Sequence, residues 1–143
     1  DYDLVKLQIG IAAGEKLKIK QEDISVKGHA IQCRINAEHP KTFIPSPGKI
    51  TQWGKPGGIG VRVDSHVYDG CVISPYYDAL IAKICAHGID RNEALARMVF
   101  ALEEFFVEGI DTNKDLQEII LNEENFRNAN LSINYLQNVL DIN

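Results

Sequence analysis

The chain has 143 residues, of which 45% are hydrophobic and 24% are charged, and its formal net charge is −5. This length and composition are typical of a single folded domain and exclude a disordered chain. The negative charge and the scattered basic residues disfavour nucleic acid as a partner, because phosphate backbones are bound by basic faces.

The three cysteines, Cys33, Cys71 and Cys85, are odd in number and never spaced as CxxC. Neither a disulfide framework nor a metal site is therefore predicted. No apolar run reaches the length of a membrane span and no secretory leader opens the chain, so we expect no membrane association and a cytoplasmic location. Because the chain starts without Met, we interpret residues 1–143 as a single domain cut from a longer protein.

The first predicted element is a helix over residues 4–12. Asp3 is suited to cap it, apolar residues recur at helical spacing, and Gly14 stands where a helix commonly ends. The charged residues 15–28 that follow are expected to form a solvated connector.

Alternation of apolar and polar residues predicts two strands, over residues 30–37 and 59–67. Shorter strands are expected over residues 49–53 and 71–73. Gly and Pro residues between these segments predict turns. The middle of the chain is therefore expected to be a small antiparallel sheet or a barrel-like assembly.

Helices are predicted again in the last part of the chain. The first is expected between Asp78, as its N-cap, and Gly88, and the next follows a capping box of Asp90 and Glu93. Two shorter helices are expected behind caps at Thr112 and Ser132. The order of helix, strands and helices predicts an α+β fold with a small antiparallel sheet flanked by helices.

Four aromatic residues near these helices are expected to be packed. The adjacent Phe105 and Phe106 lie at the end of the strongest amphipathic pattern and are predicted to belong to the core. Tyr76 and Tyr77 precede the first of the late helices and are expected to pack as amphipathic side chains.

Arg62 is the side chain that we predict to carry chemistry. It follows the bend Pro56-Gly57-Gly58 and Gly60, where a backbone without Cβ atoms lets a ligand come close. Its planar, permanently charged fork suits a carboxylate, a bicarbonate or an oxygen that gains negative charge. The alternative is a surface arginine paired with Asp64.

Other candidates have weaker support from the sequence. His66 and Tyr68 share the face of Arg62, but a lone His on a strand more often makes an ordinary hydrogen bond. The glycines near Arg62 precede a strand and lack the spacing of a phosphate-binding loop. Cys71 has no demonstrable activating neighbour, so a nucleophile is not predicted there.

Several segments match one known family in the same order. They are GHAIQCRINAE, FIPSPGKI, PGGIGVRVDSHVYDG, PYYDALIAK, RNEALARM and EGIDTNKDL. Together they resemble the C-terminal domain of biotin carboxylase, and the resemblance runs from about residue 3 to residue 140. It implies an ATP-grasp ligase in which ATP activates bicarbonate as carboxyphosphate and the carboxyl group then passes to biotin on the biotin carboxyl carrier protein.

The resemblance also implies a role for Arg62, which falls on the arginine of the family's GGxGVR motif. That arginine is implied to be catalytic and to contact biotin and bicarbonate. The sites for ATP and for Mg or Mn are implied to lie before Asp1, so the fragment is expected to bind no cofactor and to be inactive alone. Glu38-His39-Pro40 resembles a later, non-catalytic segment and is assigned no role.

The resemblance implies acetyl-CoA carboxylase as the parent, in which biotin carboxylation is the first half-reaction and leads to fatty acid synthesis. A stand-alone subunit and one domain of a multidomain carboxylase both fit the sequence, and so do an acyl-CoA and a keto acid as the final carboxyl acceptor. The implied partners are the biotin carboxyl carrier protein, the carboxyltransferase subunits, the ATP-grasp part of the same chain and a second copy in a homodimer. The alternative is a dimerisation or carrier-docking module in which Arg62 makes no direct catalytic contact.

Overall fold

The strand β6 (Leu80–Gly88) lies at the centre of the largest sheet. It pairs antiparallel with β1 (His29–Asn36) on one side and with β4 (Val61–Ser65) on the other, which gives the order β1-β6-β4. The structure is a computed structural model that describes residues 2–140. The strands expected over residues 30–37 and 59–67 are thus confirmed as β1 and a shorter β4.

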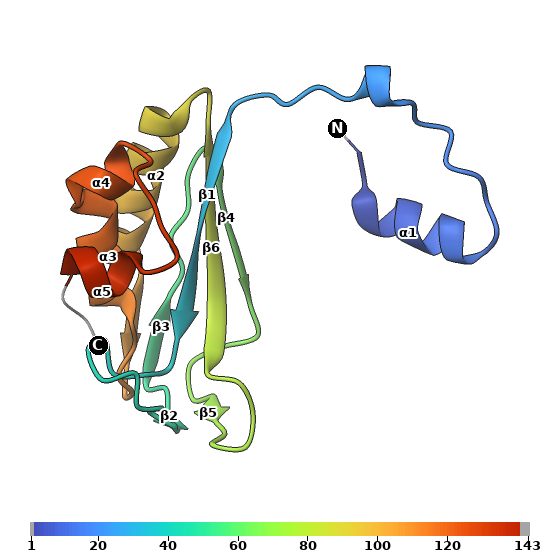
Figure 1. Ribbon diagram of the computed structural model, residues 1–143. Helices are drawn as coiled ribbons and strands as arrows, with labels where there is room; N and C mark the ends of the chain where they lie inside the picture. The colour runs from blue at the N-terminus through green and yellow to red at the C-terminus, as the bar shows by residue number, and fades with distance from the viewer. Residues whose placement is uncertain (1, 141–143) are drawn as a thin grey trace.

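One face of this sheet forms the core. Ile31, Ala86 and Val61 make one cross-strand row, and Cys33, Ile84 and Val63 make the next. The helix α2 (Arg91–Glu104) covers this face (Figure 1) and starts where expected, with the Asp90 carboxylate accepting from the Glu93 N–H at 2.9 Å. It buries five residues against the sheet: Ala94, Leu95, Met98, Ala101 and Leu102.

The remaining elements surround this core. β2 (Gly48–Lys49) pairs with β5 (Val72–Ile73), and β3 (Gln52–Gly54) pairs with β7 (Phe106–Glu108). The last helices are α3 (Lys114–Asn122), α4 (Glu124–Arg127) and α5 (Tyr135–Leu140). The α+β class is confirmed. The described strands form open antiparallel sheets, however, and do not close into a barrel.

The helix expected between Asp78 and Gly88 is wrong, because this segment is β6. Its residues alternate, with Ile84 and Ala86 buried in the core while Lys83 and Cys85 face the other side. Pairing with a strand on each side overrides a short apolar run that fits either structure. Asp78 is accordingly no helix cap, and its carboxylate accepts from the Leu80 N–H in a local turn at 3.2 Å.

The expected aromatic packing is only partly confirmed. Phe105 is fully buried, whereas Phe106 opens β7 and is half exposed over Gly54. Adjacent residues of an extended chain point to opposite sides, so both cannot enter the core. The packing expected for Tyr76 and Tyr77 is wrong, because both rings are exposed in the turn before β6.

Residues 2–28 form an arm that extends away from the body, residues 29–140 (Figure 1). The arm contains α1 (Leu4–Ala12) and a 3-10 turn (Gln21–Asp23). The predicted helix is confirmed, and the Asp3 carboxylate caps it by accepting from the Lys6 N–H at 3.0 Å. Across the described residues, no helix combines the length and the apolar run needed to cross a bilayer.

Candidate active site

The bend before β4 fixes where Arg62 emerges. Gly58 and Gly60 have φ values of 116° and 76°, which L side chains rarely adopt. A Cβ at Gly60 would collide with the His87 carbonyl oxygen, so the close approach of β4 to β6 needs glycine here. Gly57 and Gly58 have no atom within 4 Å of a Cβ position, which leaves the tip of the bend bare.

Arg97 of α2 holds the end of β6 against this bend. Its guanidinium donates to the His87 carbonyl at 2.6 Å and to the Glu93 carboxylate at 2.6 Å. The His87 N–H in turn donates to the Gly60 carbonyl at 2.8 Å. A charged hydrogen-bond network from the helix therefore anchors the backbone two residues before Arg62.

Arg62 lies on the face of the sheet opposite α2, and its side chain is 72% exposed. Its Nη2 lies 3.0 Å from Oδ2 of Asp64, two residues further along the same strand face. Exposed ion pairs of this kind contribute only about 0–1 kcal/mol. The guanidinium can therefore exchange Asp64 for an anionic ligand at little cost.

The strand register places further polar groups beside Arg62. Cys85 stands opposite Arg62, and Gln32 stands opposite Cys85 on the next strand, with Sγ and Oε1 3.7 Å apart. In the adjacent row, Asp64, Lys83 and Arg34 lie across the three strands. We call these six residues the open face: Arg62, Asp64, Lys83, Cys85, Gln32 and Arg34.

A hollow of about 200 Å³ continues the open face between β4 and β6, and its lining includes Asp64, His66 and Lys83. His66 is exposed just beyond β4, and Tyr68 is exposed in the following turn. The open face and this hollow together combine three cations, Arg62, Lys83 and Arg34, with an imidazole at one end. Such a set can hold a small anion or stabilise negative charge on an oxygen.

Cys33 is unsuited to chemistry, because it points into the core and is 2% exposed. Burial, with a smaller contribution from Cys85, raises the pKa of its thiol to about 12. A thiol held neutral in this way is neither a nucleophile nor a metal ligand. Among residues 2–140, no three His, Cys, Asp or Glu side chains gather closely enough to hold a metal ion.

The segment Glu38-His39-Pro40 shapes the loop after β1. Nδ1 of His39 accepts from the N–H groups of Lys41 and Thr42 at 3.2 and 3.3 Å. Glu38 accepts from the side-chain amide of Asn36 at 3.1 Å. Glu38 also accepts from the side-chain amide of Asn113 at 3.4 Å, so hydrogen bonds within the domain involve the polar groups of both Glu38 and His39.

The sequence predicts Arg62 as a site residue but not its neighbours Lys83 and Cys85, because the pattern of their segment predicts a helix in place of β6. The alternation of Lys83, Cys85 and His87 with Ala82, Ile84 and Ala86 is the signal that could have revealed a strand. Arg34 and Gln32 were placed correctly on the polar side of β1. Their proximity to Arg62 follows from the strand order, which local patterns do not determine.

Comparisons with known proteins identify the family of the chain. A family model described as biotin carboxylase C-terminal domain matches residues 32–138. The chain is 54% identical over 141 residues to biotin carboxylase of Haemophilus influenzae, covering 99% of this chain and 32% of the relative. It is 49% identical over 135 residues to a pyruvate carboxylase subunit of Methanothermobacter thermautotrophicus, covering 94% of this chain and 28% of the relative.

A comparison with solved structures also finds biotin carboxylase domains. The biotin carboxylase domain dimer of 2-oxoglutarate carboxylase from Hydrogenobacter thermophilus, in complex with MgADP, ADP and bicarbonate, matches with a TM-score of 0.93 and 42% identity. The match covers 99% of this chain and 31% of that one. The chain therefore spans about a third of the length of these relatives. It belongs to the biotin carboxylase C-terminal domain family.

Proposed function

We propose that this domain supplies Arg62 to a biotin-carboxylating active site that the ATP-grasp part of the parent chain completes. The observation that carries the proposal is the position of Arg62, which is exposed on the open face with only the weak partner Asp64. Transfer of a carboxyl group to biotin requires loss of a ureido proton and places negative charge on the ureido oxygen. A fixed guanidinium stabilises that charge more in the transition state than in the ground state.

Arg62 is suited to two anionic groups in this reaction. Its fork can hold the carboxylate oxygens of bicarbonate through paired hydrogen bonds, which a lysine ammonium cannot reproduce. The network from Arg97 to Gly60 restrains the backbone beside Arg62 and so fixes the position from which its side chain extends. Binding of ATP and of Mg or Mn is assigned to the ATP-grasp part, and the isolated fragment is expected to be inactive.

The test is turnover of the complete carboxylase with free biotin, bicarbonate and ATP. We expect Arg62→Ala to lower the rate by about 100-fold or more, as for loss of one preorganised charge donor. Arg62→Lys should restore little of the rate. Arg127→Ala is the matched control, because Arg127 is also an exposed arginine but lies on α4, outside the open face.

The control is expected to stay within a few-fold of the unaltered enzyme. An unchanged rate in Arg62→Ala would refute the proposal and favour the alternative, a dimerisation or carrier-docking module. The Arg62–Asp64 ion pair is the observation on the side of that alternative. Sedimentation of the complete enzyme over a concentration series then measures whether loss of Arg62 alters assembly.

We further propose acetyl-CoA carboxylase as the parent, acting in the cytoplasm in fatty acid synthesis with a biotin carboxyl carrier protein and carboxyltransferase subunits. The higher identity to a relative named biotin carboxylase, 54% against 49% for a pyruvate carboxylase subunit, supports this choice. Transfer of labelled carboxyl groups from the loaded carrier to acetyl-CoA, and not to pyruvate, is the expected result. Transfer to pyruvate alone would contradict it.

A further inference from the structure

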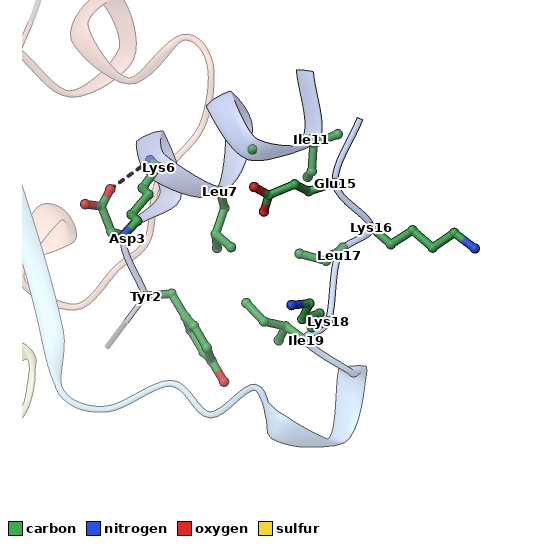
Figure 2. Close-up of a pocket in the computed structure, with 11 residues that line it drawn as sticks. Tyr2, Asp3, Lys6, Leu7, Ile11, Glu15, Lys16, Leu17, Lys18 and Ile19 are labelled. Carbon is green, nitrogen blue, oxygen red and sulfur yellow. Dashed lines mark hydrogen bonds between the residues drawn. The ribbon is translucent and has the colours of Figure 1, made fainter. Parts of the chain in front are cut away.

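Asn113 is 5% exposed, and among residues 2–137 it is the only buried residue with an amide or charged side chain. Polar side chains of the arm, by contrast, stay in water. Figure 2 shows Lys16 directed away from the hollow beside α1 that Leu7 and Ile19 line. Burying an amide costs free energy unless its donor and acceptor groups find partners. The hydrogen bonds of Asn113 therefore indicate what it does in the fold.

The side chain of Asn113 does not serve its own helix. Asn113 is the N-cap of α3, a position where an asparagine side chain usually accepts from an N–H of the first turn. Here it makes no such hydrogen bond, and only its backbone carbonyl accepts, from the Gln117 N–H at 3.2 Å. Where a residue departs from such a local preference, the reason commonly lies in function.

The side-chain amide pairs with β1 instead. Its Nδ2 donates to the Arg34 carbonyl at 3.2 Å, and its Oδ1 accepts from the Asn36 N–H at 2.9 Å. The Asn113 N–H also donates to the Asn36 carbonyl at 3.2 Å. Because β6 occupies the other side of β1, these bonds lie along the outer edge of the sheet, where a further strand would pair. The amide thus takes the place of a peptide group of a neighbouring strand.

Glu38 fixes the orientation of this amide. Its Oε1 accepts from Nδ2 of Asn113 at 3.4 Å and from the side-chain amide of Asn36 at 3.1 Å. An ionised carboxylate can only accept, so the nitrogen of the Asn113 amide must face Glu38 and the Arg34 carbonyl. The oxygen of the amide is then left to accept from the Asn36 N–H. The Asn113 side chain is therefore held in one orientation.

This end of β1 is where the sheet itself holds the strand least well. The register between β1 and β6 shifts between Ile35 and Asn36, and a bulge of this kind disrupts the ladder of hydrogen bonds locally. The Arg34 carbonyl points away from β6, so the ladder does not hold it. Its hydrogen bonds come from Asn113 and, at 3.5 Å, from Nε2 of Gln117.

The bonds from Asn113 set the position of one cation of the open face. The Arg34 side chain is 54% exposed, and Asp78, at 4.0 Å, is its ion-pair partner among the described residues. Such a weak partner does not fix a long side chain, so the place of the guanidinium depends on the backbone from which it extends. Since β1 and β4 flank β6, Arg34 and Arg62 extend from opposite edges of the sheet. Holding an anion over this face requires both edges to be fixed.

We propose that Asn113 is a positioning residue of the active site, which fixes the β1 edge of the open face and with it the Arg34 guanidinium. The network of Arg97 fixes the β4 edge in the same way. This inference rests on the proposed function, which places bicarbonate on this face. Charge donors that are held in place before the reaction need no reorganisation during it. Because Asn113 is buried, it acts through β1 and not by contact with substrate.

Steady-state kinetics of the complete carboxylase with bicarbonate, ATP and free biotin test the proposal. Asn113→Ser removes the amide but keeps a residue that is favourable as an N-cap, so α3 is retained. We expect kcat/KM for bicarbonate to fall about 10-fold or more, because a displaced charge donor loses much of its effect. The KM for ATP should stay unchanged, whereas a general loss of structure would alter it as well.

Asn122→Ser is the matched control for this substitution. Asn122 lies on the same helix and is exposed, and its side chain donates only to the Glu118 carbonyl, at 2.9 Å. The control should keep kcat/KM for bicarbonate within about 2-fold of the unaltered enzyme, as is usual for an exposed site. Circular dichroism checks that each variant is folded.

The decisive measurement repeats the substitution in an Arg34→Ala enzyme. If Asn113 acts through Arg34, Asn113→Ser should change kcat/KM of that enzyme by no more than about 2-fold, since the side chain that it positions is gone. An equal loss with and without Arg34 would overturn the proposal, because a merely structural effect does not depend on Arg34. An unchanged rate in Asn113→Ser alone would overturn it too.

A second variant covers the case in which Asn113→Ser does not fold. Asn113→Asp then takes its place in both backgrounds, because it keeps an acceptor for the Asn36 N–H and lacks the donor to the Arg34 carbonyl. Failure of this proposal is also distinct from failure of the proposed function. Full turnover of Arg62→Ala would end the proposed function, whereas an equal effect of Asn113→Ser with and without Arg34 would end only the positioning role.

Discussion

The body and the arm contain similar apolar residues, but the body buries them and the arm leaves them exposed. In the body, Ile35 and Ile84 are fully buried between the sheet and its helices. In the arm, Ile9 and Ile11 are 66% and 50% exposed on a helix that is equally well formed and capped. The difference shows that helical periodicity determines where a helix forms, whereas the surrounding chain determines whether its apolar face is covered.

The largest expected effect is the difference in free energy of unfolding between a truncated core residue and a truncated arm residue. Leu102→Ala removes a fully buried side chain of α2 and should lower the free energy of unfolding by about 2–5 kcal/mol. Ile9→Ala in the same 143-residue chain should change it by about 0.5 kcal/mol or less, because the lost surface was exposed. Urea unfolding followed by circular dichroism measures both, and equal losses would break the distinction between body and arm.

A smaller effect is expected at the bend before Arg62. Gly60→Ala should cost about 1–3 kcal/mol of stability, because φ of 76° strains any Cβ and this one meets the His87 carbonyl. Gly57→Ala is the control, since a Cβ there has no neighbour within 4 Å and should be tolerated. Thermal unfolding compares the two variants. Equal stability would show that the bend is not held by β6.

The smallest expected effect is a pH-dependent change in stability from a hydrogen bond between α5 and the start of α4. The Tyr135 hydroxyl donates to Glu123 at 2.6 Å, and this hydrogen bond, with those from Asn125 and the Phe126 N–H, lowers the pKa of Glu123 to about 2 from 4.5. A carboxyl whose pKa is lower in the folded state stabilises that state at pH values above its pKa in the unfolded chain. This contribution to stability therefore disappears as the pH falls from about 4.5 to about 2.

The stability difference between the unaltered chain and Tyr135→Phe should therefore be largest near neutral pH and shrink below pH 4.5. Urea midpoints of the two chains across this pH range provide the measurement. A difference that stays constant with pH would mean that the hydrogen bond does not set the pKa of Glu123.

Much of the fold follows from local patterns. α1 and β1 can be predicted within a residue or two of their ends, and α2 at its start, because each has a clear period and each helix has a capping residue. The apolar pattern predicts α2 as far as Gly109, whereas the helix ends at Glu104 and β7 begins at Phe106. The helix predicted over β6 is wrong, since a short apolar segment fits a helix or a central strand and only its two neighbours decide. β7 escapes prediction because its three residues follow directly on α2 and pair with the distant β3.

The candidate site shows the same limit. The exposure of Arg62 could be predicted, because alternation in β4 and the glycine bend are both local features. The placement of Lys83 opposite Asp64 and of Cys85 opposite Arg62 could not, because register depends on the pairing of β4 with β6. The missing cover of α1 could not be recognised either, since burial is a property of the surrounding chain.

The most direct test of a role for Arg62 is to observe its guanidinium while substrate binds. In the complete carboxylase with labelled arginine, the Nε–H resonance of Arg62 should shift when biotin and bicarbonate are added. That of Arg127, on α4 and outside the open face, should not move. A resonance of Arg62 that stays unchanged at concentrations of biotin that saturate turnover would contradict direct contact and with it the proposed function.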